Sequence, residues 1–172
     1  YFFDYRKDLL NEFSFKNNIS NNKYLDVINN HNVVSISIRQ NRYSERKNNK
    51  YDQESINKSH DFVSATVDYI YQSIKFIKSK VDNPKFLLWS NDFTDLEKYF
   101  PKNEFLYVVN SEDKILNDFY LLTQCKYFIV GPSTFSWWGA WLSNYENKIC
   151  IRPKNINPSN NIDFWPESWI SI

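Results

Sequence analysis

Residues 131–136, Gly-Pro-Ser-Thr-Phe-Ser, combine the residue types that can surround an anion. The apolar run before them, Tyr127–Val130, is typical of a buried strand. Gly131-Pro132 ends this strand and turns the chain. Ser133 and Thr134 then stand where hydroxyl groups cap a helix, because they accept hydrogen bonds from its first free amides. Together these features predict an anion site, usually for phosphate; a capped, buried helix without a ligand is the alternative.

Two arginines follow a second predicted strand, Val33–Arg39, whose β-branched residues partly alternate with serines. A guanidinium group is a forked, permanently charged donor that matches phosphate oxygens. Arg39 is therefore a candidate phosphate ligand and catalytic residue, and Arg42 is a candidate for a second contact. A solvent-exposed side chain is the ordinary alternative for an arginine at this position.

Asn91 and Asp92 follow a third predicted strand, Lys85–Ser90. The Asp92 carboxylate can accept hydrogen bonds from the ring and exocyclic amines of guanine. The alternative is an N-cap for a short helix predicted over 93–99, a place that Asn91 or Asp92 would fill well. Both interpretations of Asp92 stay open at this point.

The elements that must position these residues alternate between strands and helices. Val63, Val67, Ile70 and Ile74 lie on one apolar stripe, which predicts a helix over 61–81. The same reasoning predicts further strands over 104–109 and 148–152, and further helices over 1–15, 21–28 (capped by Ser20), 114–124 (capped by Ser111 or Asp113) and 134–142. The alternation indicates an α/β fold with a Rossmann-like, doubly wound parallel sheet.

Three segments are expected to meet at one edge of this sheet, because doubly wound sheets bind ligands beyond the carboxyl ends of their strands. The sequence therefore predicts one site that contains Arg39, Arg42, Asn91, Asp92, Ser133, Thr134, Phe135 and Ser136. Gly139-Ala140, in the last of the predicted helices, would allow another backbone to approach closely.

Residues 44–59 contain almost nothing apolar and predict a long surface loop, of the kind that often serves as a lid or a binding loop. Glu45 and Asp52 in this segment are candidates for a catalytic base on charge alone. Solvated side chains are the ordinary interpretation of both.

Composition excludes several classes of function. The 172 residues carry a net charge of +1, so the chain has no electrostatic footprint for nucleic acid or an anionic membrane. Cys125 and Cys150 are expected to be free buried thiols in a reducing compartment. No Cys or His spacing fits a metal site, and no apolar run is long enough to span a membrane. The chain lacks an initial methionine and a signal peptide, and we expect it to be part of a longer cytoplasmic protein.

Several segments resemble glycosyltransferase family 11, the α-1,2-fucosyltransferases. Residues 133–142, Ser-Thr-Phe-Ser-Trp-Trp-Gly-Ala-Trp-Leu, are similar to the most specific motif of the family. Residues 119–126 resemble the preceding helix, 88–92 the Phe-Ser-Asp-Asp strand end, and 166–169 the carboxyl-terminal ending. Residues 37–43 depart from the family's His-Ile-Arg-Arg-Gly-Asp-Tyr, because Ser37 stands in the His position and Arg42 in the Asp position.

The resemblance implies an inverting, metal-independent enzyme that transfers fucose from GDP-fucose to a galactose hydroxyl of a surface glycan such as lipopolysaccharide. It also implies the carboxyl-terminal, donor-binding half of a GT-B enzyme, with an amino-terminal acceptor domain missing and peripheral association with the inner membrane. We expect a helical segment over 1–30, a nucleotide-sugar-binding domain over 31–172, and little or no transfer by the domain alone. The departures at Ser37 and Arg42 leave another nucleotide-sugar donor, or a non-catalytic binding domain, as alternatives.

Overall fold

The computed structural model describes residues 3–13, 22–44, 52–109, 115–156 and 161–172. Its centre is one parallel sheet with the strand order β3-β2-β1-β4-β5-β6. The strands are β1 (Val33–Ile38), β2 (Lys85–Ser90), β3 (Phe105–Tyr107), β4 (Tyr127–Ile129), β5 (Ile149–Arg152) and β6 (Ile170–Ser171). The expected Rossmann-like α/β fold is confirmed. The strand order reverses between β1 and β4, which is where doubly wound sheets bind their ligands.

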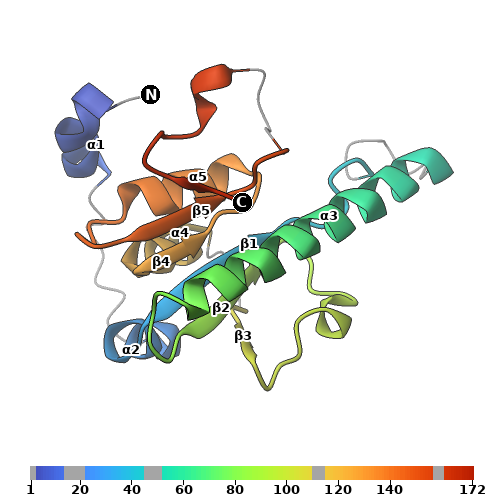
Figure 1. Ribbon diagram of the computed structural model, residues 1–172, viewed down its shortest axis with the longest axis horizontal. Helices are drawn as coiled ribbons and strands as arrows, with labels where there is room; N and C mark the ends of the chain where they lie inside the picture. The colour runs from blue at the N-terminus through green and yellow to red at the C-terminus, as the bar shows by residue number, and fades with distance from the viewer. Residues whose placement is uncertain (1–2, 14–21, 45–51, 110–114, 157–160) are drawn as a thin grey trace.

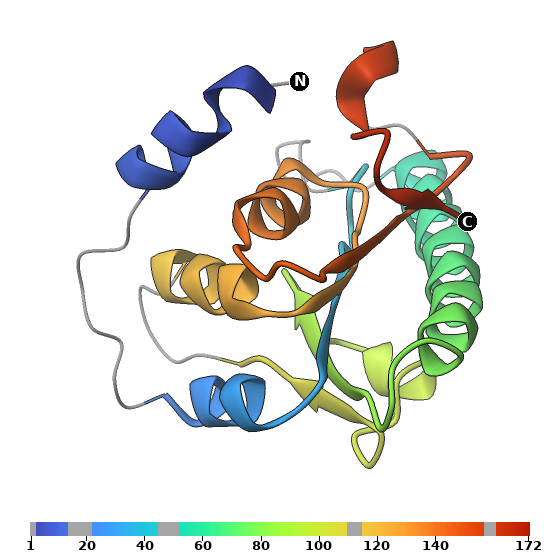
Figure 2. The same cartoon turned by 60° about the vertical axis from the view of Figure 1, so that its left-hand side comes forward.

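Helices cover both faces of the sheet (Figures 1 and 2). The long helix α3 (Gln53–Lys78) lies on one face, and α2 (Lys23–Asn30), α4 (Ile115–Gln124) and α5 (Thr134–Leu142) lie on the other. Successive strand residues point to opposite faces. In β1, Val34, Ile36 and Ile38 pack toward α3, so Ser35 and Ser37 face the side of α4 and α5.

Helix α3 begins earlier than the sequence predicts. Its N-cap is Asp52, whose carboxylate accepts a hydrogen bond from the backbone N–H of Ser55 at 2.8 Å. The prediction of a surface loop over 44–59 is therefore wrong for residues 53–59. Residues 45–51 of this segment lie outside the described residues. The polar start of α3 is held by serines: Ser59 is buried, and its Oγ accepts from the backbone N–H of Tyr43 at 3.1 Å. At the start of this helix the sequence signal is therefore a capping carboxylate and a buried serine, and not an apolar stripe.

The amino-terminal segment is helical, as predicted, in the part that the structure describes. It contains the 3-10 turn η1 (Phe3–Tyr5) and α1 (Arg6–Glu12). Helix α2 is capped by Asn22, whose side chain accepts from the backbone N–H of Tyr24 at 2.9 Å. The predicted cap Ser20 lies outside the described residues, as do Ser111 and Asp113.

Other boundaries differ slightly from the predictions. The helix expected over 93–99 is only the 3-10 turn η2 (Leu96–Lys98), because Asp92 caps the preceding turn at Thr94 instead. Cys125 and Cys150 are free and buried, as expected. No helix in the described ranges is long and apolar enough to cross a membrane.

The carboxyl-terminal segment packs back on α5. It contains the 3-10 turn η3 (Ile162–Phe164) and the edge strand β6. The Trp137 indole of α5 donates to the Phe164 carbonyl oxygen at 2.7 Å, and its ring lies 5.7 Å from the ring of Trp169. These aromatic contacts fix α5 from its outer side.

Both glycines are required by close packing. A Cβ on Gly131 would overlap the Ser37 carbonyl oxygen, so the β4–α5 turn can lie against the end of β1 only without a side chain. A Cβ on Gly139 would overlap the side chain of Leu122 in α4. A close approach at Gly139 does occur, but the prediction that a backbone makes it is wrong, because the side chain of Leu122 makes it.

Candidate functional site

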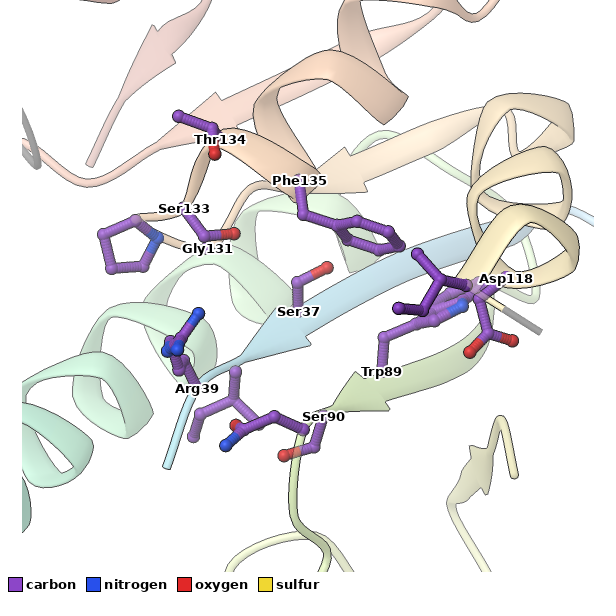
Figure 3. A pocket seen from close by; sticks show the side chains of 13 residues that line it. Ser37, Arg39, Trp89, Ser90, Asp118, Gly131, Ser133, Thr134 and Phe135 are labelled. Carbon is purple, nitrogen blue, oxygen red and sulfur yellow. The ribbon is translucent and has the colours of Figure 1, made fainter. Parts of the chain in front are cut away.

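A cavity of about 340 Å³ lies at the carboxyl edge of the sheet, where the strand order reverses. The segments that line it end β1 and β2, follow β4 and begin α4 (Figure 3). Its lining residues are Ser37, Ile38, Arg39, Trp89, Ser90, Asn91, Ile115, Asp118, Gly131, Pro132, Ser133, Thr134 and Phe135. The convergence of three strand ends that the sequence predicts is confirmed, and α4 is a fourth contributor that sequence reasoning missed.

The start of α5 forms one wall of the cavity. Ser133 is the N-cap, and its Oγ accepts from the backbone N–H of Ser136 at 3.3 Å. Ser136 is buried behind this turn and donates its hydroxyl to the Gly131 carbonyl oxygen at 2.7 Å. Ser133, Thr134 and Phe135 line the cavity, whereas Ser136 supports the turn from inside.

Arg39 lies across the cavity from this helix start. It is exposed, and Figure 3 shows its guanidinium group turned toward Ser133. Arg42 is placed differently: its Nη1 donates to the Pro132 carbonyl oxygen at 2.7 Å, and its guanidinium lies 4.9 Å from the centre of the Phe62 ring. Arg39 lines the cavity, and Arg42 instead joins the β1–α3 connection to the β4–α5 turn.

The polar residues after β2 mostly bond to the protein. Asn91 lines the cavity and accepts from the backbone N–H of Gln40 at 2.9 Å. Asp92 does not line it: one carboxylate oxygen accepts from the backbone N–H of Thr94 at 2.8 Å and the other from Asn41 Nδ2 at 3.1 Å. The hydrogen bond from Thr94 lowers the pKa of Asp92. Of the two interpretations left open for Asp92, the geometry favours the local cap.

Two buried polar groups of the cavity have no partner among the described residues. They are the hydroxyl of Ser37 and the indole N–H of Trp89. Ser37 is only 8% exposed and Trp89 only 5%. The two residues are register partners on β1 and β2. A buried polar group without a partner costs about 1–3 kcal/mol, and a ligand that supplies the partner removes this cost. Figure 3 shows both side chains at the cavity, on either side of Phe135.

Asp118 and Ile115 bring α4 into the site. Sequence reasoning placed both in a helix and assigned them no role. The topology could have indicated their place at the site, because a helix that follows a strand begins at the carboxyl edge of a parallel sheet. Asp118 lies in the first turns of α4 and is the one acidic residue among the lining residues.

The cavity therefore has two chemically different ends. Arg39, Ser133 and the first backbone N–H groups of α5 form an end that suits a phosphate. Figure 3 shows Trp89, Phe135 and Asp118 toward the other end, which has aromatic walls and one carboxylate and suits a nucleobase. The described residues contain no group of three or more His, Cys, Asp or Glu that could hold a metal ion. Asp52, a candidate base, caps α3, and Glu45 lies outside the described residues.

Comparison with known proteins gives one family. A family model described as Glycosyl transferase family 11 matches residues 1–171. An alpha-1,2-colitosyltransferase of Escherichia coli is 32% identical over the whole chain, which spans 59% of that protein. The O-antigen biosynthesis glycosyltransferase WbnK of Escherichia coli is 32% identical over 62% of the chain and 36% of its own length. No solved structure matches the chain.

Proposed function

The chain belongs to glycosyltransferase family 11, and on this premise we propose that it is the donor-binding part of an inverting glycosyltransferase. The proposed reaction transfers L-fucose from GDP-fucose to a galactose hydroxyl of a surface glycan in α-1,2 linkage. The chain spans 59% of the colitosyltransferase, and its match to WbnK spans 36% of that protein. We therefore assign the acceptor surface to a further part of the protein and expect the described domain alone to transfer little.

The observation that carries the proposal is the placement of Arg39 opposite the start of α5. A nucleotide sugar contains a diphosphate, whose charge needs donors on more than one side. Arg39 supplies a fixed positive charge on one side, and the first N–H groups of α5 supply aligned dipoles on the other. Arg42 would act indirectly, by holding the Pro132 turn in place.

The base would occupy the other end of the cavity. A carboxylate accepts from both N–H groups on the pairing edge of guanine, and Asp118 is the lining residue that can do so. This assignment replaces Asp92, whose two oxygens already accept hydrogen bonds from Thr94 and Asn41. Phe135 and Trp89 would contact the flat faces or edges of the base.

The chemistry that these residues support is departure of the nucleotide. As the bond between the sugar and the diphosphate breaks, negative charge grows on the leaving oxygen. Arg39 and the N–H groups of α5 would stabilise this charge more in the transition state than in the bound donor. In this proposal no metal ion is needed, because the protein's own donors neutralise the diphosphate. The proposal assigns no residue as the catalytic base that accepts the proton from the acceptor hydroxyl.

A second donor is favoured by one specific observation. The relative that matches along the whole chain is named as an α-1,2-colitosyltransferase, so a colitosyl group on the same nucleotide is the alternative sugar. Both candidates predict the same nucleotide site and differ only in the sugar beyond the diphosphate.

Titration calorimetry with GDP, UDP and ADP tests the proposed site. We expect GDP to bind most tightly, and Arg39→Ala to weaken its binding about 10- to 100-fold. Equal affinity for all three, or selective binding of UDP, would contradict the guanine assignment. Titration with GDP-fucose and GDP-colitose then decides between the two sugars.

A further inference from the structure

Trp89 offers a hydrogen-bond donor that none of the described residues uses. Its Nε1 is buried and has no hydrogen-bond partner in the described ranges, although the residue is only 5% exposed. An indole N–H is a donor only, so it requires an acceptor atom in the ligand. A carbonyl oxygen of a base is such an acceptor, whereas an amino group in the same place would leave two donors facing each other.

Asp118 supplies an acceptor to the same cavity. Both residues line it, and Figure 3 shows both on the side of the cavity away from Arg39. A donor next to an acceptor complements a carbonyl next to a ring N–H, which is the lactam edge of an oxo-base. The corresponding edge of an amino-base carries an amino group beside an unprotonated ring nitrogen. Both of its polar groups would be mismatched at this site, and buried mismatches are costly.

We propose that the indole N–H of Trp89 is a specificity-determining group that binds the base carbonyl oxygen, so that the site selects lactam bases over amino-bases. The proposal rests on the proposed nucleotide function and deepens it. Selection would come from a residue on β2, adjacent to Ser37 on β1 through the strand register. Neither the strand sequence nor its apolar pattern predicts this, because Trp89 is part of a continuous core strand.

Inosine and adenosine diphosphates test the proposal most sharply, since they differ only at the edge in question. Trp89→Phe removes the N–H and keeps an aromatic ring. Trp165→Phe is the matched control: the Nε1 of Trp165 is also buried without a partner among the described residues, but Trp165 does not line the cavity. Thermal unfolding of each variant verifies that it is folded before titration.

We expect the wild-type chain to bind IDP at least about tenfold more tightly than ADP. Trp89→Phe should reduce this ratio of affinities about three- to tenfold, mainly because it weakens the binding of IDP. Trp165→Phe should leave the ratio unchanged. An unchanged ratio in Trp89→Phe, or an equal loss for IDP and ADP, would overturn the role of Trp89 while the nucleotide site stands. No binding of IDP, ADP or GDP by the wild-type chain would contradict the proposed function and this proposal together.

Discussion

Two groups of polar side chains lie at the same edge of the sheet and differ in what they bond to. Arg42, Asp92 and Ser136 make hydrogen bonds within the protein, to Pro132, Thr94 and Gly131. Ser37 and Trp89 are more deeply buried than Asp92, yet their polar atoms have no partner in the described part of the chain. The first group maintains the loops, and the second is available to a ligand. Position after a strand is therefore not enough to identify a binding residue.

The comparison predicts that substitutions in the two groups separate binding from stability. Arg39→Ala should have the largest effect on binding. It removes an exposed charge that lines the cavity, so GDP affinity should fall about 10- to 100-fold while the free energy of unfolding changes little. Calorimetry and urea unfolding measure the two quantities. Arg39→Lys, which keeps the charge and loses the fork, should lie between. A large loss of stability would show that Arg39 maintains the loops, as Arg42, Asp92 and Ser136 do.

The far end of α5 provides a stability effect that should leave binding unchanged. Lys148 Nζ donates to the carbonyl oxygens of Ala140, Trp141 and Ser143 at 2.8, 3.2 and 2.8 Å, and Arg6 donates to the last two as well. Burial lowers the pKa of Lys148 from 10.5 to about 8. Between these values the unfolded state binds the proton and the folded state releases it, so the contribution of Lys148 to stability rises with pH.

The stability difference between the wild-type chain and Lys148→Met should therefore increase from pH 8 to pH 10.5, by about 1–3 kcal/mol in total. The difference between the two proteins cancels the titration of the tyrosines, which they share. Urea unfolding at several pH values measures it. A flat or falling difference would show that the three carbonyl acceptors keep the ammonium charged throughout this range.

Ser136→Ala should destabilise the turn behind the cavity. It removes the hydrogen bond to the Gly131 carbonyl oxygen and leaves that oxygen without this donor, so we expect a loss of about 1–2 kcal/mol. GDP affinity should fall less than in Arg39→Ala, because Ser136 does not line the cavity. Urea unfolding and calorimetry on the same preparation test both parts. Unchanged stability together with a strong loss of affinity would move Ser136 into the ligand-binding group.

Among the substitutions of cavity-lining residues, Ser37→Ala should have the smallest effect on affinity. Its hydroxyl lies at the cavity between Arg39 and Phe135 (Figure 3) and has no hydrogen-bond partner among the described residues. We expect IDP and ADP affinities to fall alike, about three- to fivefold, with stability equal to or above that of the wild-type chain. A change in the IDP to ADP ratio would instead assign Ser37 to the base edge beside Trp89.

The sequence predicted the sheet and the place of the site, because both depend on patterns along single segments. Apolar runs gave five of the strands, and the Gly131-Pro132-Ser133 turn gave the cap of α5. The start of α3 was missed because a cap and buried serines, and not an apolar stripe, hold it. Asp118 and Trp89 were missed because their significance depends on which side chains meet in space. A tryptophan in an apolar strand shows no sign in the sequence that its N–H is unpaired.

The most direct test of a cavity with a phosphate end and a base end uses the two halves of the ligand separately. Pyrophosphate and guanosine are titrated by NMR into the wild-type chain, Arg39→Ala and Trp89→Phe. We expect Arg39→Ala to weaken pyrophosphate binding at least about tenfold and to leave guanosine binding within about twofold. Trp89→Phe should weaken guanosine binding about three- to tenfold and leave pyrophosphate binding within about twofold. Equal losses of both ligands in both variants, or perturbed signals away from the cavity, would contradict the division of the site.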